Sequence, residues 1–328
     1  MNSTPTARCI GLSCLVAASS LLIAGTAASQ NYPNRSIRMI VPTAPGGGSD
    51  FIARTLNDKL IPALGQQVVV DNRAGAGGNI GAELAAKASP DGYTVIVVTS
   101  SHASNISLYK KLNYHPTKDF TAITQLAANA FLVCVTQTST AKTLKELVSL
   151  AQSRQGKFSY ASAGPGQGAH LGMELFRTMA GFEATHVPYN GIAPAAVSLL
   201  GGQVDIAMLT PPVSLPHVKS GRLRLLAVTT MKRTVFLPDT PTVAEQGYPG
   251  FELNNWTGLV APAGTPKPVV MKLYEEIARV LRNQEVVDRL ATLNTEPVGS
   301  TPDEFAAFIE AEIVKWGRVI RQSGASAD

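Results

Sequence analysis

The residues best suited to chemistry in this sequence form a glycine-rich loop, PTAPGGGSD, at positions 42–50. The loop follows the predicted strand IRMIV at 37–41 and precedes a stretch of helical periodicity at 51–64, so its backbone amides would lie at a helix N-terminus. Such a terminus attracts anions, and glycine lets a backbone approach a ligand closely. Ser49 could cap the helix or donate its hydroxyl to a ligand. A tight turn closed by a capping serine is the alternative interpretation.

Three further loops of small residues also precede predicted helices. They lie at 73–79, 162–170 and 187–191, and their candidate ligand-binding residues are Asn79, Ser162, Gly164, Gly166 and His170. In open α/β sheets, ligands bind beyond the carboxyl ends of the strands, so we expect these loops to face one cleft. His170 stands out because it begins a helix beside a glycine-rich loop and could donate a hydrogen bond to a carboxylate.

Other polar residues lie close to predicted strand ends. Ser100 and Ser101 follow the strand predicted at 93–98 and offer hydroxyl donors, although a capped turn explains them as well. Asp50 and Asp205 could accept a hydrogen bond from a hydroxyl or ammonium group of a ligand. Asp205 could instead end the turn before it, whereas we predict that Asp50 selects among carboxylates.

The glycine-rich loops do not match the common nucleotide-binding motifs. A phosphate-binding loop of the Walker type needs a lysine after its last glycine, and none follows Gly48. The dinucleotide fingerprint needs a third glycine where Phe51 stands in the first loop and Ile80 in the second. The sequence therefore predicts no nucleotide and no other cofactor.

Catalytic, metal-binding and nucleic-acid-binding patterns are also missing from the sequence. There is no Gly-x-Ser-x-Gly elbow, the histidines lack metal-ligand spacing, and Cys134 lies in an apolar run that predicts a buried, inert thiol. The formal net charge is +5, but lysine and arginine are scattered in ones and twos. We therefore predict no catalytic residue, no metal site and no nucleic-acid partner. A mildly positive surface suits anionic solutes.

The chain of 328 residues exceeds the size at which one core usually stops growing, roughly 250–300 residues, which favours two lobes. Strand-like and helical runs alternate, and the order βαβαβ occurs twice, which predicts parallel α/β architecture in each lobe. We predict crossings between the lobes near 121–130 and 229–234, with a hinge and an interlobe cleft. The predicted divisions are a signal peptide at 1–29, a first lobe at 30–125 and 231–328, and a second lobe at 126–230.

The first residues indicate export. Arg8 precedes an apolar run at 9–24 and small residues at 25–29, so we predict cleavage near Ala28 or Ser29. A membrane anchor is the alternative, but serines shorten the apolar run below the roughly 18–20 residues that a span needs.

Together these motifs resemble those of the Bug-type receptors, the extracytoplasmic solute-binding proteins of tripartite tricarboxylate transporters. The resemblance spans nearly all of the mature chain. It is carried by PTAPGGGSD at 42–50, DNRAGAGGNIG at 71–81, PDGYT at 90–94, YASAG at 160–164, HVPY at 186–189, GGQVD at 201–205 and APAGTP at 261–266. One departure is the Thr43-Ala44-Pro45 segment, because an aromatic residue often follows the first proline in this family.

The resemblance implies a periplasmic binding protein fold of type II, in which two loops hold a ligand carboxylate with backbone amides, hydroxyls and bridging waters. The positions that match the family's motifs are Thr43, Ala44, Gly47, Ser49, Asp50, Ser100, Ser101, Ser162, Gly164 and His170. We expect a monomeric periplasmic receptor that closes around a small mono-, di- or tricarboxylate, or a related acid or amide, for a membrane permease. A ligand-sensing subunit for a membrane kinase and a secreted enzyme acting on small organic acids are the alternatives.

Overall fold

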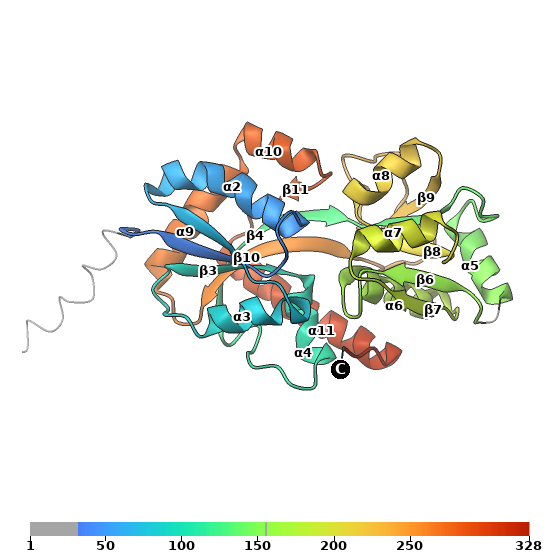
Figure 1. Ribbon diagram of the computed structural model, residues 1–328, viewed down its shortest axis with the longest axis horizontal. Helices are drawn as coiled ribbons and strands as arrows, with labels where there is room; N and C mark the ends of the chain where they lie inside the picture. The colour runs from blue at the N-terminus through green and yellow to red at the C-terminus, as the bar shows by residue number, and fades with distance from the viewer. Residues whose placement is uncertain (1–31, 155, 328) are drawn as a thin grey trace, which may run out of the picture.

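The computed structural model describes residues 32–154 and 156–327, which form two lobes, each around its own β-sheet (Figure 1). The strand order is β11-β4-β10-β3-β1-β2 in the first sheet and β7-β6-β8-β5-β9 in the second. The predicted two-lobed α/β architecture is therefore confirmed. The predicted signal peptide lies outside the described residues.

The first sheet is built from the strands predicted near the N-terminus and from later strands that return to it. Its strands are β1 (Ile37–Val41), β2 (Val68–Asn72), β3 (Thr94–Thr99), β4 (Phe120–Ala130), β10 (Asn254–Pro262) and β11 (Glu296–Pro297). Helices α2 (Gly48–Leu64), α9 (Lys267–Leu281) and α10 (Gln284–Ala291) cover one face, and α3 (Asn79–Ala86), α4 (Ser100–Leu108) and α11 (Pro302–Ser323) cover the other (Figure 1). A short 3₁₀ helix, η1 (Ala76–Gly78), precedes α3.

Alternation along β1 explains how the first sheet holds two layers of helices. Met39 packs in the cluster that contains the apolar side of α2, while Ile40 packs in the cluster that contains α3 and α4. Successive side chains of a strand point to opposite faces, so a strand with apolar side chains on both faces needs cover on both sides. β1, in which all residues except Arg38 are buried, is thus an inner strand of the sheet.

The second sheet follows the predicted pattern closely. Its elements are β5 (Leu132–Thr136), α5 (Leu144–Ser153), β6 (Ser159–Ser162), α6 (Gly168–Ala180), β7 (Thr185–Pro188), α7 (Ile192–Leu200), β8 (Ile206–Leu209), α8 (Pro211–Lys219) and β9 (Leu223–Val228). Cys134 on β5 is fully buried, and burial raises the pKa of its thiol to about 12, as expected for an inert packing residue.

Neither sheet is purely parallel, which corrects the sequence-based expectation. β1 pairs in parallel with β2 and β3, and β6 pairs in parallel with β7 and β8. However, β10 runs antiparallel to β3 and β4, and β5 runs antiparallel to β8 and β9. The reason is the path of the chain, since a strand that leaves a lobe and a strand that returns to it point in opposite directions.

Two strands carry the chain between the lobes. The first is β4, which ends at Ala130 and is followed at Leu132 by β5 of the other sheet. After β9, residues 229–253 stay with the second lobe: Val243 donates its amide to Val228 at 3.0 Å, and the Phe251 ring packs edge-on against Phe176 at 6.0 Å. The chain enters the first sheet only with β10. We therefore propose a second lobe that extends from about 126 to 253, with the return near 254 rather than at 229–234.

The last helix, α11, packs against helices of both lobes. α11 begins with a capping box in which Thr301 and Glu304 bond each other's backbone, and it packs against both α4 and α6. The indoles of Trp256 and Trp316 both donate to one buried carboxylate oxygen of Glu312, at 3.0 and 2.8 Å. Trp256 is therefore a packing residue. In the described part of the chain, no helix is long and apolar enough to span a membrane.

Candidate functional site

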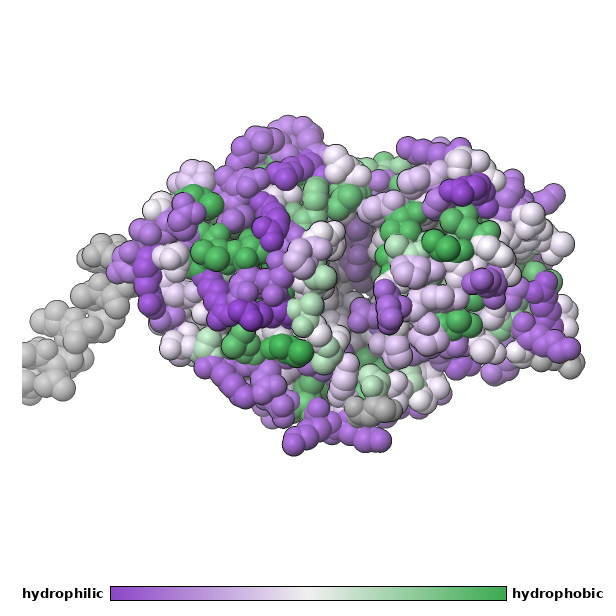
Figure 2. Space-filling view, in the orientation of Figure 1, coloured by the Kyte–Doolittle hydropathy of each residue, from purple (hydrophilic) through white to green (hydrophobic). Residues whose placement is uncertain are grey.

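The site lies where the loops of both lobes meet, and Figure 2 shows the surface hollowed between the two lobes. On the first lobe, α2 begins at Gly48 with Gly47 as its N-cap, three residues earlier than the periodicity indicated. Ser49 therefore lies inside the first turn and does not cap it. Ala44 is exposed, and the buried Thr43 hydroxyl finds no hydrogen-bond partner among the described residues.

Asp50 is tied into the first loop and is only 3 % exposed. Its carboxylate accepts hydrogen bonds from the Gly46 amide at 2.9 Å, from Arg54 Nε at 3.0 Å and from Asn72 Nδ2 at 3.0 Å. Burial by itself raises the pKa of Asp50, but the bonds from Arg54, Gly46 and Asn72 outweigh it and lower the pKa. The structure thus shows Asp50 bonded within the first lobe, and its predicted role as a selector among carboxylates stays a prediction.

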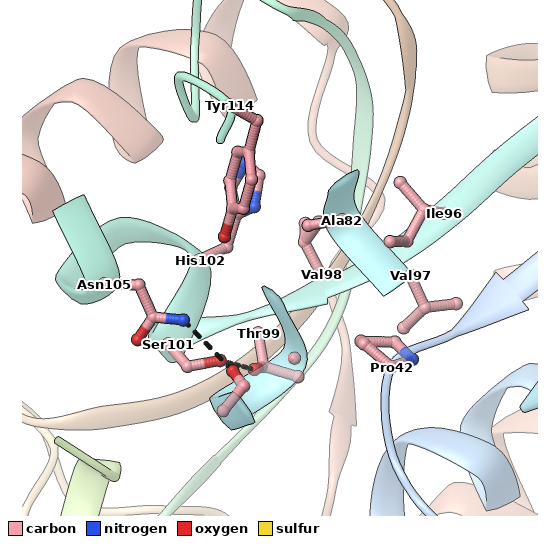
Figure 3. A pocket seen from close by; sticks show the side chains of 12 residues that line it. Pro42, Ala82, Ile96, Val97, Val98, Thr99, Ser101, His102, Asn105 and Tyr114 are labelled. Atoms are coloured by element: carbon pink, nitrogen blue, oxygen red, sulfur yellow. Dashed lines mark hydrogen bonds between the residues drawn. The ribbon is translucent and has the colours of Figure 1, made fainter. Parts of the chain in front are cut away.

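A second group of candidates surrounds the start of α4. A cavity of about 10 Å³ is lined by residues that include Pro42, Gly78 and Ser101, so the first two loops and α4 are neighbours (Figure 3). Ser101 Oγ lies 3.0 Å from Thr99 Oγ1. Asn79 Oδ1 accepts from Asn105 Nδ2 at 2.6 Å and from a tyrosine hydroxyl at 2.8 Å, both in the first lobe. Asn79 instead orders this part of the first lobe.

The second lobe contributes the loop between β6 and α6. Ser162, at the end of β6, accepts a hydrogen bond from the Gly164 amide at 3.1 Å. Gly164 and Gly166 have φ values of +125° and +73°, a region that L side chains rarely adopt, so this turn requires glycine. His170 lies in the first turn of α6, and its Nδ1 accepts from the Gly166 amide at 2.9 Å. The predicted residues of this loop therefore lie together.

His186 was missed as a functional candidate by the sequence reasoning. Its Nε2 lies 2.6 Å from Ser162 Oγ, and its ring stacks on that of His170 with centroids 4.0 Å apart. The HVPY motif marked this position, but the parallel pairing of β6 with β7 that brings His186 to Ser162 joins residues far apart in the chain. Ser104 and Leu108 on α4 were also missed, because they contact Gly166, which is far from them in the chain.

The loops of the two lobes touch at α4. Ser104 Oγ donates to the Gly166 carbonyl at 3.5 Å, and Ser100 Oγ lies 3.6 Å from the position that a Cβ on Gly168 would occupy. A Cβ on Gly166 would lie 2.3 Å from Leu108 Cδ1, so the second loop rests against the first lobe. Ser100, Gly166 and Ser162 therefore belong to one region.

The helices that begin in this region lack side-chain caps. The N-caps of α2, α4, α6 and α7 make no capping hydrogen bond through their side chains. α3, α8 and α9 also lack side-chain caps, whereas α5, α10 and α11 are capped by Thr143, Asn283 and Thr301. First-turn amides have no partner within a helix, so these termini offer donors and positive dipole ends to an anion.

Asp205 lies apart from these residues, contrary to its inclusion among the ligand-binding candidates. It precedes β8 and accepts hydrogen bonds from the amide and hydroxyl of Ser159, at 2.8 and 3.2 Å, and from Arg154. Ser159 begins β6, whereas Ser162 ends it, so Asp205 is at the opposite edge of the sheet. Its role is structural. Within residues 32–154 and 156–327, no group of three or more His, Cys, Asp or Glu side chains could hold a metal ion.

Two sheets joined by two crossing strands, with uncapped helix N-termini gathered at the junction, define a two-lobed binding-protein fold. The family model described as the tripartite tricarboxylate transporter family receptor matches residues 52–325, and the chain belongs to this family. The resemblance predicted from the loops is confirmed.

Several relatives match over nearly the whole chain. Protein BugT of Bordetella pertussis is 37 % identical over 327 residues, which cover 99 % of each chain. A structure of an R. palustris protein with adipate is 37 % identical with a TM-score of 0.80, covering 90 % of this chain and 99 % of that one. MatC of Rhodopseudomonas palustris with bound malate is 33 % identical with a TM-score of 0.76, covering 88 % and 100 %.

Proposed function

We propose that this chain is a periplasmic receptor that captures a small carboxylate between its lobes and delivers it to a membrane permease. The observation that carries the proposal is the meeting of uncapped helix N-termini at the interlobe junction, on α2, α4 and α6. Two relatives of similar fold were solved with adipate and malate, both dicarboxylates. Export through the leader at 1–29 and a monomeric state are part of the same proposal.

The chemistry of the junction suits a carboxylate. Its oxygens accept hydrogen bonds only, and the junction offers first-turn amides and the hydroxyls of Ser49 and Ser100. A carboxylate that accepts several such bonds at helix N-termini is stabilised by each dipole. Closure of the lobes would remove water and strengthen these interactions.

We propose binding without turnover. Ser162 and His186 are within hydrogen-bond distance, as a nucleophile and base would be, but Ser162 is fully buried and also accepts from the Gly164 amide. Its hydroxyl is therefore occupied within the second loop and is not presented to a solute.

Calorimetric titration against mono-, di- and tricarboxylates tests this function, with the diamide of adipic acid as the uncharged control. We expect at least one acid to bind and the diamide to fail. At a hundredfold excess over Kd the ligand should raise the free energy of unfolding by about 2.7 kcal/mol. Absence of binding to every acid, equal binding of the diamide, or consumption of the ligand would overturn the proposal.

A matched pair of serine variants locates the site. Ser100→Ala should weaken acid binding roughly tenfold or more, the cost of one hydrogen bond to a charged group. Ser149→Ala is the control, because Ser149 bonds Lys145 on the distant, exposed face of α5. Equal affinity of the two variants would place the ligand elsewhere.

A further inference from the structure

Two histidine rings stack beneath the second loop. His170 on α6 and His186 on β7 have ring centroids 4.0 Å apart and planes 10° apart. The Tyr160 ring on β6 lies nearly parallel to both, at 4.9 Å from His186 and 6.3 Å from His170. His170 is 5 % exposed and Tyr160 is fully buried, whereas the His186 side of the stack is half-buried.

Each imidazole fixes a different part of the loop. His170 Nδ1 accepts from the Gly166 amide at 2.9 Å. His186 Nε2 lies 2.6 Å from Ser162 Oγ, and that oxygen accepts from the Gly164 amide at 3.1 Å. The two amides belong to the glycines of positive φ, so the stack holds the very residues that shape the turn.

We infer that His170 and His186 are positioning residues that hold the second loop in its ligand-binding shape, and that protonation of the pair loosens this loop and releases the ligand. The inference rests on the proposed function, because it assigns a regulation to the same site.

The hydrogen-bond pattern requires a neutral His170. An amide N–H can donate to Nδ1 only through the nitrogen's lone pair, which protonation removes. Two cationic rings at 4.0 Å would also repel each other across a buried stack. Acid therefore breaks the bond to Gly166 and separates the rings, whereas a protonated His186 can still donate from Nε2 to Ser162.

The charged and titratable surroundings favour the neutral pair. Burial lowers the pKa of both rings, and burial together with the neighbouring His170 brings the pKa of His186 to about 4. Glu174 raises the pKa of both rings, whereas Arg177 lowers that of His170. The Glu174 carboxylate is itself bound by Arg177 at 2.8 and 2.6 Å and accepts from the Tyr160 hydroxyl at 2.6 Å.

Two substitutions at position 170 distinguish the loss of the hydrogen-bond acceptor from the loss of the titrating group. His170→Asn places Oδ1 near the position of Nδ1, so it can accept from Gly166 without titrating, whereas His170→Gln places its oxygen near Nε2 and leaves the amide unpaired. At pH 7.5 we expect His170→Asn to bind the acid within about threefold of wild type and His170→Gln to bind at least about tenfold more weakly. Equal affinities of the two variants would overturn the positioning role.

At position 186 we expect the same two substitutions to have the opposite order of effect. His186→Gln keeps a polar atom near Nε2 for Ser162, and His186→Asn does not. We expect the Gln variant to bind more tightly than the Asn variant here, the opposite order from position 170. This comparison also decides the matter if one of the His170 variants fails to fold.

Release by acid is measured as the ratio of Kd at pH 4.5 to Kd at pH 7.5. The ratio should be at least about fivefold larger for wild type than for His170→Asn, since only wild type can protonate that ring. Protonation of the ligand affects both proteins equally. Superimposable pH profiles would refute release by the histidine pair.

Amide hydrogen exchange in the absence of ligand keeps this test separate from the proposed function. The Gly164 and Gly166 amides should be protected in wild type and His170→Asn at pH 7.5, with protection of Gly166 lost in His170→Gln. If no acid binds, the proposed function fails, but the exchange data still decide whether the histidines position the loop. Equal protection in both variants would show that they do not.

Discussion

Asp50 accepts hydrogen bonds from three directions, and each donor comes from a different part of the first lobe. Gly46 lies in the loop, Arg54 one turn along α2, and Asn72 at the end of β2. Asn72 also donates to the Thr43 carbonyl at 3.0 Å, so one carboxylate links both sides of the loop. At the residue scale, the shape of the first loop depends on a side chain that is itself buried.

Replacing Asp50 should therefore weaken the binding of every ligand by a similar factor. We expect Asp50→Ala to lower the free energy of unfolding by about 2 kcal/mol, because it removes the hydrogen bonds that a buried carboxylate accepts from Gly46, Arg54 and Asn72, and to weaken binding of all acids by a similar factor. Chemical denaturation and titration against several acids measure the two effects. Asp58→Ala is the control, since Asp58 pairs with Arg289 at the surface and should cost at most about 1 kcal/mol. Affinity changes that differ strongly among acids would instead restore Asp50 as a selector.

At the scale of elements, one buried threonine adds hydrogen bonds to the direct antiparallel pairing of the two crossing strands, β4 and β10. Thr229 Oγ1 accepts from the Phe131 amide at 2.8 Å and lies 2.8 Å from the Leu253 carbonyl, to which it donates. Phe131 separates β4 from β5, and Leu253 precedes β10. The hydroxyl thus ties the strand that leaves the first lobe to the strand that returns.

Thr229→Val keeps the shape of this side chain and removes the hydroxyl. We expect the free energy of unfolding to fall by about 1–3 kcal/mol, because the Phe131 amide is left buried without its partner. Thr229→Ser retains the hydroxyl and should lose less. Urea denaturation of the two variants compares them directly, and an equal loss would show that packing of the methyl group matters more than the hydrogen bonds.

The whole molecule is held in its present shape by contacts that span the lobes. One continuous cluster of buried side chains includes Ile40 and Ile96 of the first lobe and Phe158 and Tyr160 of the second. α11 contacts helices of both lobes, and the second loop rests on α4. Movement of the lobes would therefore change the contact between Gly166 and Leu108 before it disturbed either sheet.

Gly166→Ala tests this contact. Its Cβ would lie 2.3 Å from Leu108 Cδ1, so we expect acid affinity to fall at least about tenfold. Gly181→Ala is matched in backbone strain, with φ of +66° against +73°, but its Cβ would meet nothing within 4 Å. It should cost stability and leave affinity unchanged. Adding Leu108→Ala should restore part of the affinity of Gly166→Ala, and failure of this rescue would show that strain alone is responsible.

The sequence was informative wherever the signal is local. Alternation and helical periodicity predicted the strands at 37–41 and 131–136 and the helices that follow the loops, because each pattern lies within a few turns of chain. The glycine-rich loops at 42–50 and 162–170 were identified in the same way, because a strand, a loop and the start of a helix follow one another directly in the sequence. The family followed from the order of these motifs.

The sequence by itself thus determined the family, the two α/β units and the loops that could hold an anion. Only the tertiary structure shows that Asp50 is buried and that Asp205 lies at the opposite edge of its sheet from Ser162. It also supports our proposal that the chain returns between the lobes near 254. It also brought His186 against His170 and Ser162. Each of these outcomes depends on pairing between residues distant in the chain, through strand order and register, and no local pattern of residue types specifies such pairing.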